Sequence, residues 1–114
     1  MTEQVRDEGG KCVVELGGEI DLDRAPEVRS LLLDCITRGR DVLVDLSRVS
    51  YIDSSGIASL VEALQSASKN GITLGLVAIS PMALRVFELA RLDKVFTIYP
   101  DLDAAMTTAT ADQG

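Results

Sequence analysis

The sequence predicts an α/β fold with a mixed sheet of roughly four to five strands and about four helices, parallel in its C-terminal part. From residue 42 onward, short apolar runs alternate with segments whose apolar residues recur at helical spacing. Strands that alternate with helices pair in parallel through right-handed crossovers. Nearer the N-terminus, Gly9-Gly10 is typical of a two-residue hairpin turn, which adds an antiparallel pair.

The N-terminal segment is expected to contribute the antiparallel part of the sheet. Residues 1–7 carry one clear apolar side chain, Val5, and are either a polar edge strand or a loose end. Residues 12–16 are apolar enough for a buried strand, and the GGEID segment at 17–21 is expected to break it.

The first helix is expected to begin soon after that break. Asp23 is placed to cap it, and Pro26 is tolerated in a first helical turn. Gly39 provides a stop. One face carries apolar residues at i, i+3, i+4, i+7 and i+8, which are Val28, Leu31, Leu32, Cys35 and Ile36.

The remaining strands are predicted from short apolar runs, and the remaining helices from apolar residues at helical spacing. Strands are expected at 42–46, 72–79 and 95–99, with a loop at 47–53. Helices are expected at 57–69, after Ser80-Pro81, and from Asp101 to about Ala111.

Length and composition indicate a single domain spanning 1–114, with frayed ends at 1–3 and 112–114. No segment approaches the ~18 to 20 consecutive apolar residues that a membrane span requires. The start, Met1 to Gln4, lacks the basic and apolar character of a signal peptide. We therefore expect a cytoplasmic protein that does not insert into membranes.

Composition also argues against several functions. The chain has no histidine, which excludes a Ser-His-Asp or Cys-His hydrolase. A formal charge of −7 argues against nucleic-acid binding and favours a partner with a basic face. Cys12 and Cys35 lie among apolar neighbours and are expected to be buried thiols. No cofactor, metal site or catalytic residue is predicted.

One polar cluster, Asp53-Ser54-Ser55-Gly56, stands where a strand is expected to give way to a helix. Asp53 and Ser55 are placed to cap that helix, and capping alone would explain an acidic and a hydroxyl side chain at this position. The unpaired N–H groups and positive dipole of a helix start also stabilise a phosphate, so Ser54 is equally placed to accept one. Gly56 is expected to leave one approach to that phosphate open. Taken alone, the local chemistry favours capping, because Asp and Ser are preferred N-cap residues and need no further purpose.

The order of motifs along the chain resembles that of STAS domains, most closely the bacterial anti-sigma factor antagonists. The resemblance covers residues 12–99 and rests on three segments in family order. These are GGEIDL at 17–22, VLVDLSRVSYIDSSGIASLVEAL at 42–64 and LGLVAISPMALRVFELARLDKVFTIY at 74–99.

The resemblance implies a binding protein that is switched by phosphorylation and is not an enzyme. It places the phosphate on Ser54, with Asp21, Asp23, Tyr51, Asp53, Ser55 and Gly56 flanking the site or contacting the partner. The implied partners are an anti-sigma factor that is itself a serine kinase, bound by the unphosphorylated form, and a PP2C-like phosphatase.

Two alternatives stay open. The first is a STAS regulatory subunit of a lipid-trafficking ABC transporter, although such chains often lack paired serines at this loop. The second is an enzyme with Ser54 as nucleophile and Asp53 or Lys69 as activator, which the lack of histidine disfavours.

Overall fold

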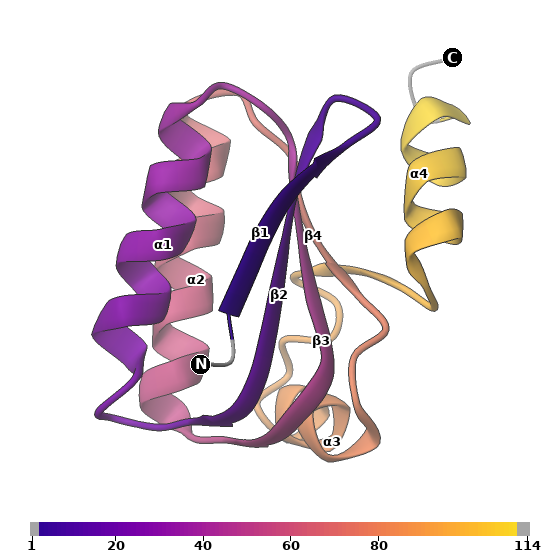
Figure 1. Cartoon of the computed structure of the whole chain (residues 1–114). Coiled ribbons are helices and arrows are strands. Elements are labelled where there is room, and N and C mark those ends of the chain that lie inside the picture. The colour runs from indigo at the N-terminus through magenta and orange to yellow at the C-terminus, as the bar shows by residue number, and fades with distance from the viewer. Residues whose placement is uncertain (1–2, 112–114) are drawn as a thin grey trace.

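The computed structural model describes residues 3–111, and within them a five-stranded sheet and four helices. The predicted α/β class is confirmed (Figure 1). The elements in chain order are β1 Glu3–Glu8, β2 Lys11–Ile20, α1 Ala25–Thr37, β3 Val42–Ile52, α2 Ser54–Lys69, β4 Leu74–Val77, α3 Pro81–Leu89, β5 Thr97–Tyr99 and α4 Leu102–Ala111.

The sheet is mixed, with strand order β1-β2-β3-β4-β5. β1 pairs with β2 in the antiparallel direction, and the other neighbours are parallel. The predicted hairpin turn is confirmed: Gly9 and Gly10 both have positive φ, 57° and 81°, which a turn of this length favours. Of the two options for residues 1–7, the described part is an edge strand that includes Glu3. The fraying expected for 1–2 and 112–114 lies outside the described residues.

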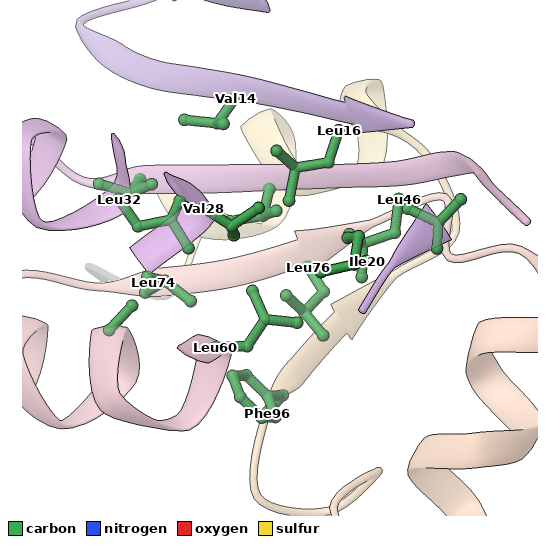
Figure 2. Close-up of a cluster of buried hydrophobic side chains, with 14 of the residues drawn as sticks. Val14, Leu16, Ile20, Val28, Leu32, Leu46, Leu60, Leu74, Leu76 and Phe96 are labelled. Atoms are coloured by element: carbon green, nitrogen blue, oxygen red, sulfur yellow. The ribbon is translucent and has the colours of Figure 1, made fainter. Parts of the chain in front are cut away.

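Helices cover the two faces of the sheet unequally. Figure 1 shows α1 and α2 side by side on one face and α4 on the other. Alternate residues of a strand point to opposite faces, so in β2 Val14 and Leu16 pack toward α1 and α2 while Val13 packs toward α4. Figure 2 shows the larger core, in which Leu32 of α1 and Leu60 of α2 meet strand side chains. Within residues 3–111, no helix is both long and apolar enough to cross a bilayer.

Strands β2 and β3 are longer than expected, so the predicted break at 17–21 and the predicted loop at 47–53 are wrong. The two strands stay paired up to Ile20 opposite Ile52. Register shifts on either side of Gly17 and Gly18 absorb the irregular sequence, and Gly18 has a φ of 73°. Because Ile20 and Ile52 are buried, burial holds this extension together despite its polar residues.

Strands β4 and β5 are shorter than predicted. Ala78 has a φ of 52°, which ends β4 after Val77. At the start of β5, the N–H groups of Val95 and Phe96 both donate to the Leu92 carbonyl, so these residues form a turn. Apolar periodicity predicts neither the positive φ of Ala78 nor the turn after Leu92.

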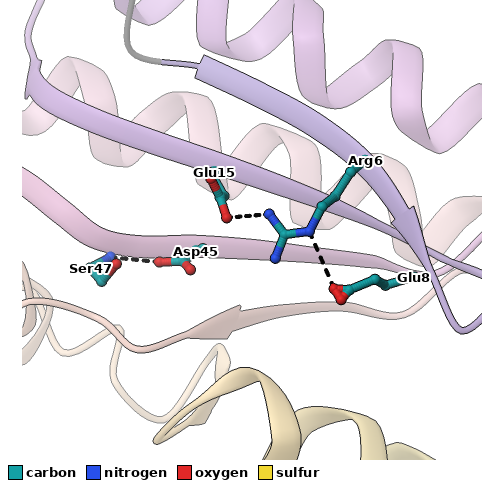
Figure 3. Close-up of polar contacts among 5 residues, drawn as sticks. All are labelled: Arg6, Glu8, Glu15, Asp45 and Ser47. Atoms are coloured by element: carbon teal, nitrogen blue, oxygen red, sulfur yellow. Dashed lines mark hydrogen bonds and ion pairs between the residues drawn. The ribbon is translucent and has the colours of Figure 1, made fainter.

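The uncovered part of the second sheet face is charged. Figure 3 shows Arg6 of β1 between Glu8 and Glu15, with ion pairs to both carboxylates. Asp45 lies opposite Glu15 on β3 and accepts a hydrogen bond from the Ser47 N–H at 2.8 Å. Water therefore reaches this part of the sheet, whereas α4 covers the rest of the face.

The two cysteines are free and buried, as predicted, and they interact with each other. Burial raises the pKa of the Cys35 thiol from its ordinary 9.0 to about 12, and the neighbouring Cys12 adds to the shift. The folded state thus favours the protonated thiol. Its contribution to stability is present below about pH 9 and is lost as the pH rises toward about 12.

We expect Cys35→Val, which removes the titrating group, to lose less stability than the wild type between about pH 8 and about pH 11. Urea unfolding of both proteins at each pH measures the difference. Iodoacetamide at about pH 8 should modify Cys35 only after unfolding, because thiolate is the reactive form. Equal losses of stability in both proteins would contradict the burial argument.

Candidate functional site

Asp53 connects the end of β3 to the start of α2. It has extended backbone angles, φ −107° and ψ −173°, and its Oδ1 accepts hydrogen bonds from the N–H groups of Ser55 at 2.9 Å and Gly56 at 3.1 Å. Its own N–H donates to the Ile20 carbonyl at 3.2 Å. The predicted cap is thus confirmed for Asp53, and the same residue joins the helix start to β2.

Ser54 is the first residue of α2 and its side chain is exposed. The helix begins three residues earlier than the apolar stripe predicted, because capping by Asp53 orders the polar turn before Ile57. Ser55, expected to share the capping, contributes its backbone N–H instead and is half-buried. Ser59, one turn further on, is buried and donates its hydroxyl to the Gly56 carbonyl at 2.7 Å.

Gly56 has a role that the sequence did not reveal. It is buried, and a Cβ built on it would lie 2.6 Å from the Ile20 carbonyl oxygen and 2.7 Å from Cγ1 of Ile52. The absence of a side chain therefore lets α2 approach β2 and β3. The expectation that Gly56 keeps an approach to a phosphate open is wrong, because the missing side chain would point into the protein.

Asp21 directly follows β2, just as Asp53 directly follows β3. The two strands are parallel neighbours, so both residues lie at the same edge of the sheet. Its Oδ1 accepts from the N–H groups of Asp23 at 3.1 Å and Arg24 at 3.2 Å. The expectation that Asp23 caps α1 is wrong: the N-cap position is Arg24, which has no side-chain cap, and Asp21 organises the turn. Asp23 is exposed beside it.

Arg24 ties this turn to β2 and β1, a role that was not predicted from the sequence. Its guanidinium donates to the carbonyls of Gly17 at 2.7 Å and Glu19 at 2.8 Å, and forms an ion pair with Glu3 of β1. It thereby satisfies carbonyls in the irregular end of β2. Arg24 is the only basic residue in the stretch 17–28, which is the one signal that could have drawn attention to it.

Two further features complete the surroundings of Ser54. Tyr51, opposite Glu19 in the β2–β3 pairing, is 45% exposed. A hollow of about 490 Å³ lies between the first halves of α1 and α2 and is lined in part by Pro26 and Ser55. Arg29 and Glu62, which form an ion pair, bound it.

Asp53→Ala is expected to lower the free energy of unfolding by about 1 kcal/mol, within a range of roughly 0.5–2 kcal/mol for lost N-caps. Asp53→Asn keeps an acceptor at the same position and should lose less. Urea unfolding followed by circular dichroism measures both. If the two variants were equally destabilised, the carboxylate charge would matter more than the hydrogen bonds.

At the start of α2, the N–H groups of Ser55 and Gly56 are already bound to the Asp53 carboxylate. Among residues 3–107, whose side chains are described, no three Cys, Asp or Glu side chains come together as metal ligands would. The exposed Ser54 hydroxyl stands at the start of a 16-residue helix, where the helix dipole favours negative charge. Asp21 and Asp53 directly follow the adjacent parallel strands β2 and β3, and Tyr51 is the second-last residue of β3.

The chain is similar to several known proteins. The chain is 33% identical over 85 residues to the anti-sigma-B factor antagonist of Bacillus subtilis, a match that covers 75% of this chain and 78% of the relative. It is 35% identical over 80 residues to the protein of the same name from Staphylococcus aureus, covering 69% and 74%. The crystal structure of an anti-sigma factor antagonist from Mycobacterium paratuberculosis superposes with a TM-score of 0.85 at 33% identity, covering 94% and 92%. The model of the STAS domain family matches residues 2–105, and the chain therefore belongs to the STAS domain family.

Proposed function

We propose that this chain is an anti-sigma factor antagonist controlled by phosphorylation of Ser54. In its unphosphorylated form it binds and sequesters an anti-sigma factor that is also a serine kinase, and phosphorylation by that kinase releases it. A PP2C-like phosphatase restores binding. The names of the Bacillus subtilis and Staphylococcus aureus relatives support the antagonist role.

The observation that carries the proposal is the different use of neighbouring hydroxyls at the start of α2. Ser54 is exposed at the first helical position, whereas Ser55 is half-buried and Ser59 is buried and hydrogen-bonded within the helix. A kinase needs a hydroxyl that it can reach. Of these three serines, Ser54 meets that requirement best.

A phosphate at Ser54 would act through charge. It adds about −1.5 to −2 charges at pH 7 to a chain whose formal charge is −7. The dipole of α2 favours that charge within the free protein. In a complex, the same group would have to lose its hydration beside Asp21, Asp23 and Asp53, which opposes binding.

The direct test uses purified anti-sigma factors with kinase-type ATPase domains encoded in the same genome as this chain. Each is incubated with the chain, ATP and Mg²⁺, and the product is measured by intact-mass spectrometry. We expect one kinase to add a single phosphate to the wild type and to Ser55→Ala, and none to Ser54→Ala.

Two results would overturn the proposal. Phosphate addition to Ser54→Ala would move the modification elsewhere. Absence of phosphorylation by every such kinase, combined with co-purification of the chain with a transporter ATPase, would favour the role of a STAS subunit in a transporter complex.

A further inference from the structure

Strand β1 is an open edge of the sheet. Within residues 3–111 it pairs with β2 alone, and its other side faces away from the sheet (Figure 1). On that side, every second residue of an edge strand has an N–H and a C=O without a partner in the sheet. A further strand from another molecule would satisfy these groups, so the edge favours an extended segment over a helix.

A groove lies beside this edge, between β1 and α1, and we call it the β1–α1 groove. It has a volume of about 340 Å³ and is lined by Glu3 and Val5 of β1 and by Glu27 and Leu31 of α1. Val5 and Leu31 are partly buried and pack against the main core. Residues two apart on a strand share a face, as do residues four apart on a helix. The groove therefore has an apolar part at Val5 and Leu31 and a carboxylate part at Glu3 and Glu27.

The β1–α1 groove is separate from the hollow between α1 and α2. That hollow is lined by Pro26 and Arg29 of α1, together with Ser55 and other residues of α2. The β1–α1 groove is lined by Glu27 and Leu31, and the two sets have no residue in common. An occupant of the groove would thus lie on a different side of α1 from the start of α2.

Two carboxylates at one end of the groove share a single cation. The Arg24 guanidinium forms an ion pair with Glu3 and donates hydrogen bonds to the carbonyls of Gly17 and Glu19. Glu27 is exposed and has no ion pair among the described residues. This end of the groove therefore carries excess negative charge.

Farther along the two elements the charges are balanced. Asp7, which shares a strand face with Val5, forms an ion pair with Arg40 at 2.7 Å. Asp34 lies seven residues after Glu27 on α1, and the exposed Arg38 follows it by one turn. A segment that fits the groove would therefore carry its arginine or lysine at the end near Glu27.

A second copy of β1 fits this edge poorly. Twofold symmetry requires the two β1 strands to pair in the antiparallel direction. In the registers that pair most of the strand, Glu3 of one copy stands opposite Asp7 or Glu8 of the other. Like charges directly opposite each other are destabilising, so the edge favours a segment of different sequence.

We propose that the β1–α1 groove binds an extended segment of a partner protein, which adds a sixth strand to the sheet next to β1. An apolar side chain of that segment lies between Val5 and Leu31, and an arginine or lysine two residues away lies beside Glu27. Backbone hydrogen bonds supply affinity and alternate side chains supply specificity. Ser54 takes no part, so this binding is additional to the proposed function.

The test uses the purified chain and a phage library that displays random dodecapeptides. We expect the selected peptides to share a lysine or arginine two residues from a valine, isoleucine or leucine. A synthetic peptide with the most enriched sequence is then titrated into isotope-labelled chain and followed by NMR. The backbone amide signals of residues 3–8 and 27–31 should move, and those of residues 53–56 should not.

Charge variants measure the specificity of that peptide by isothermal titration calorimetry. Glu27→Lys replaces attraction with repulsion and should weaken binding about tenfold or more. The matched control is Glu88→Lys, an exposed residue of α3, which changes the net charge equally and should bind as the wild type does. Ser54→Asp should also bind as the wild type does. Urea unfolding of each variant verifies that stability is unchanged.

Four results would overturn the inference. If no peptide is enriched, or if the enriched peptides lack the alternating pattern, the edge does not select such a strand. Movement of signals outside the β1–α1 groove would place the peptide elsewhere. Equal weakening by Glu27→Lys and Glu88→Lys would mean that only net charge matters. Loss of binding in Ser54→Asp would assign the peptide to the start of α2.

Discussion

Ser54→Asp is expected to bind the kinase-type anti-sigma factor about 10- to 1,000-fold more weakly than the wild type, equivalent to a few kcal/mol. The carboxylate introduces charge at the exposed start of α2, where binding would bury it beside Asp21 and Asp53. Free protein should tolerate the change, because a helix N-terminus stabilises an acidic side chain. Isothermal titration calorimetry measures the affinity.

Ser54→Asn is the matched control, because asparagine has nearly the size of aspartate without its charge. It should keep most of the affinity, and Ser54→Ala should bind without response to ATP. Should Asn weaken binding as strongly as Asp, steric exclusion and not charge would explain the effect. The circular dichroism spectra of all three variants are expected to match that of the wild type.

Gly56→Ala is expected to destabilise the fold by about 1–3 kcal/mol or more, the range for overpacked sites. The new methyl group would lie 2.6 Å from the Ile20 carbonyl oxygen, a backbone atom that cannot rotate away. Either α2 shifts away from the sheet or β2 distorts at its end. Urea unfolding measures the loss.

Ser54→Ala in the same helical turn provides the comparison, since its side chain is exposed and the change should alter stability by about 0.5 kcal/mol or less. A Gly56→Ala variant as stable as Ser54→Ala would show that α2 can move without cost. Because alanine is the better helix former by about 1 kcal/mol, helix propensity alone predicts stabilisation, so the sign of the effect distinguishes the two arguments.

The parts of the fold that sequence predicts well depend on local chemistry. Helical stripes predicted α1, including the buried Val28 and Leu32, and the Gly9-Gly10 pair predicted the hairpin. The cap by Asp53 was predictable because an N-cap involves residues two and three positions away.

The missed features depend on contacts between distant segments. β3 continues to Ile52 because β2, about thirty residues earlier, runs beside it. Gly56 matters because the Ile20 carbonyl approaches it, and no pattern around position 56 reports that approach. Arg24 acts on carbonyls of the preceding strand, so its role required the tertiary structure.

The close seating of Gly56 against Ile20 has a consequence for how a signal could leave this site. The start of α2, the end of β2 and the end of β3 meet at van der Waals distance, and the Asp53–Ile20 hydrogen bond joins them. A group added to Ser54 would therefore stand on three segments that are packed against one another. We expect phosphorylation and dephosphorylation to change the charge that this edge presents to another molecule, and to leave the shape of the fold unchanged.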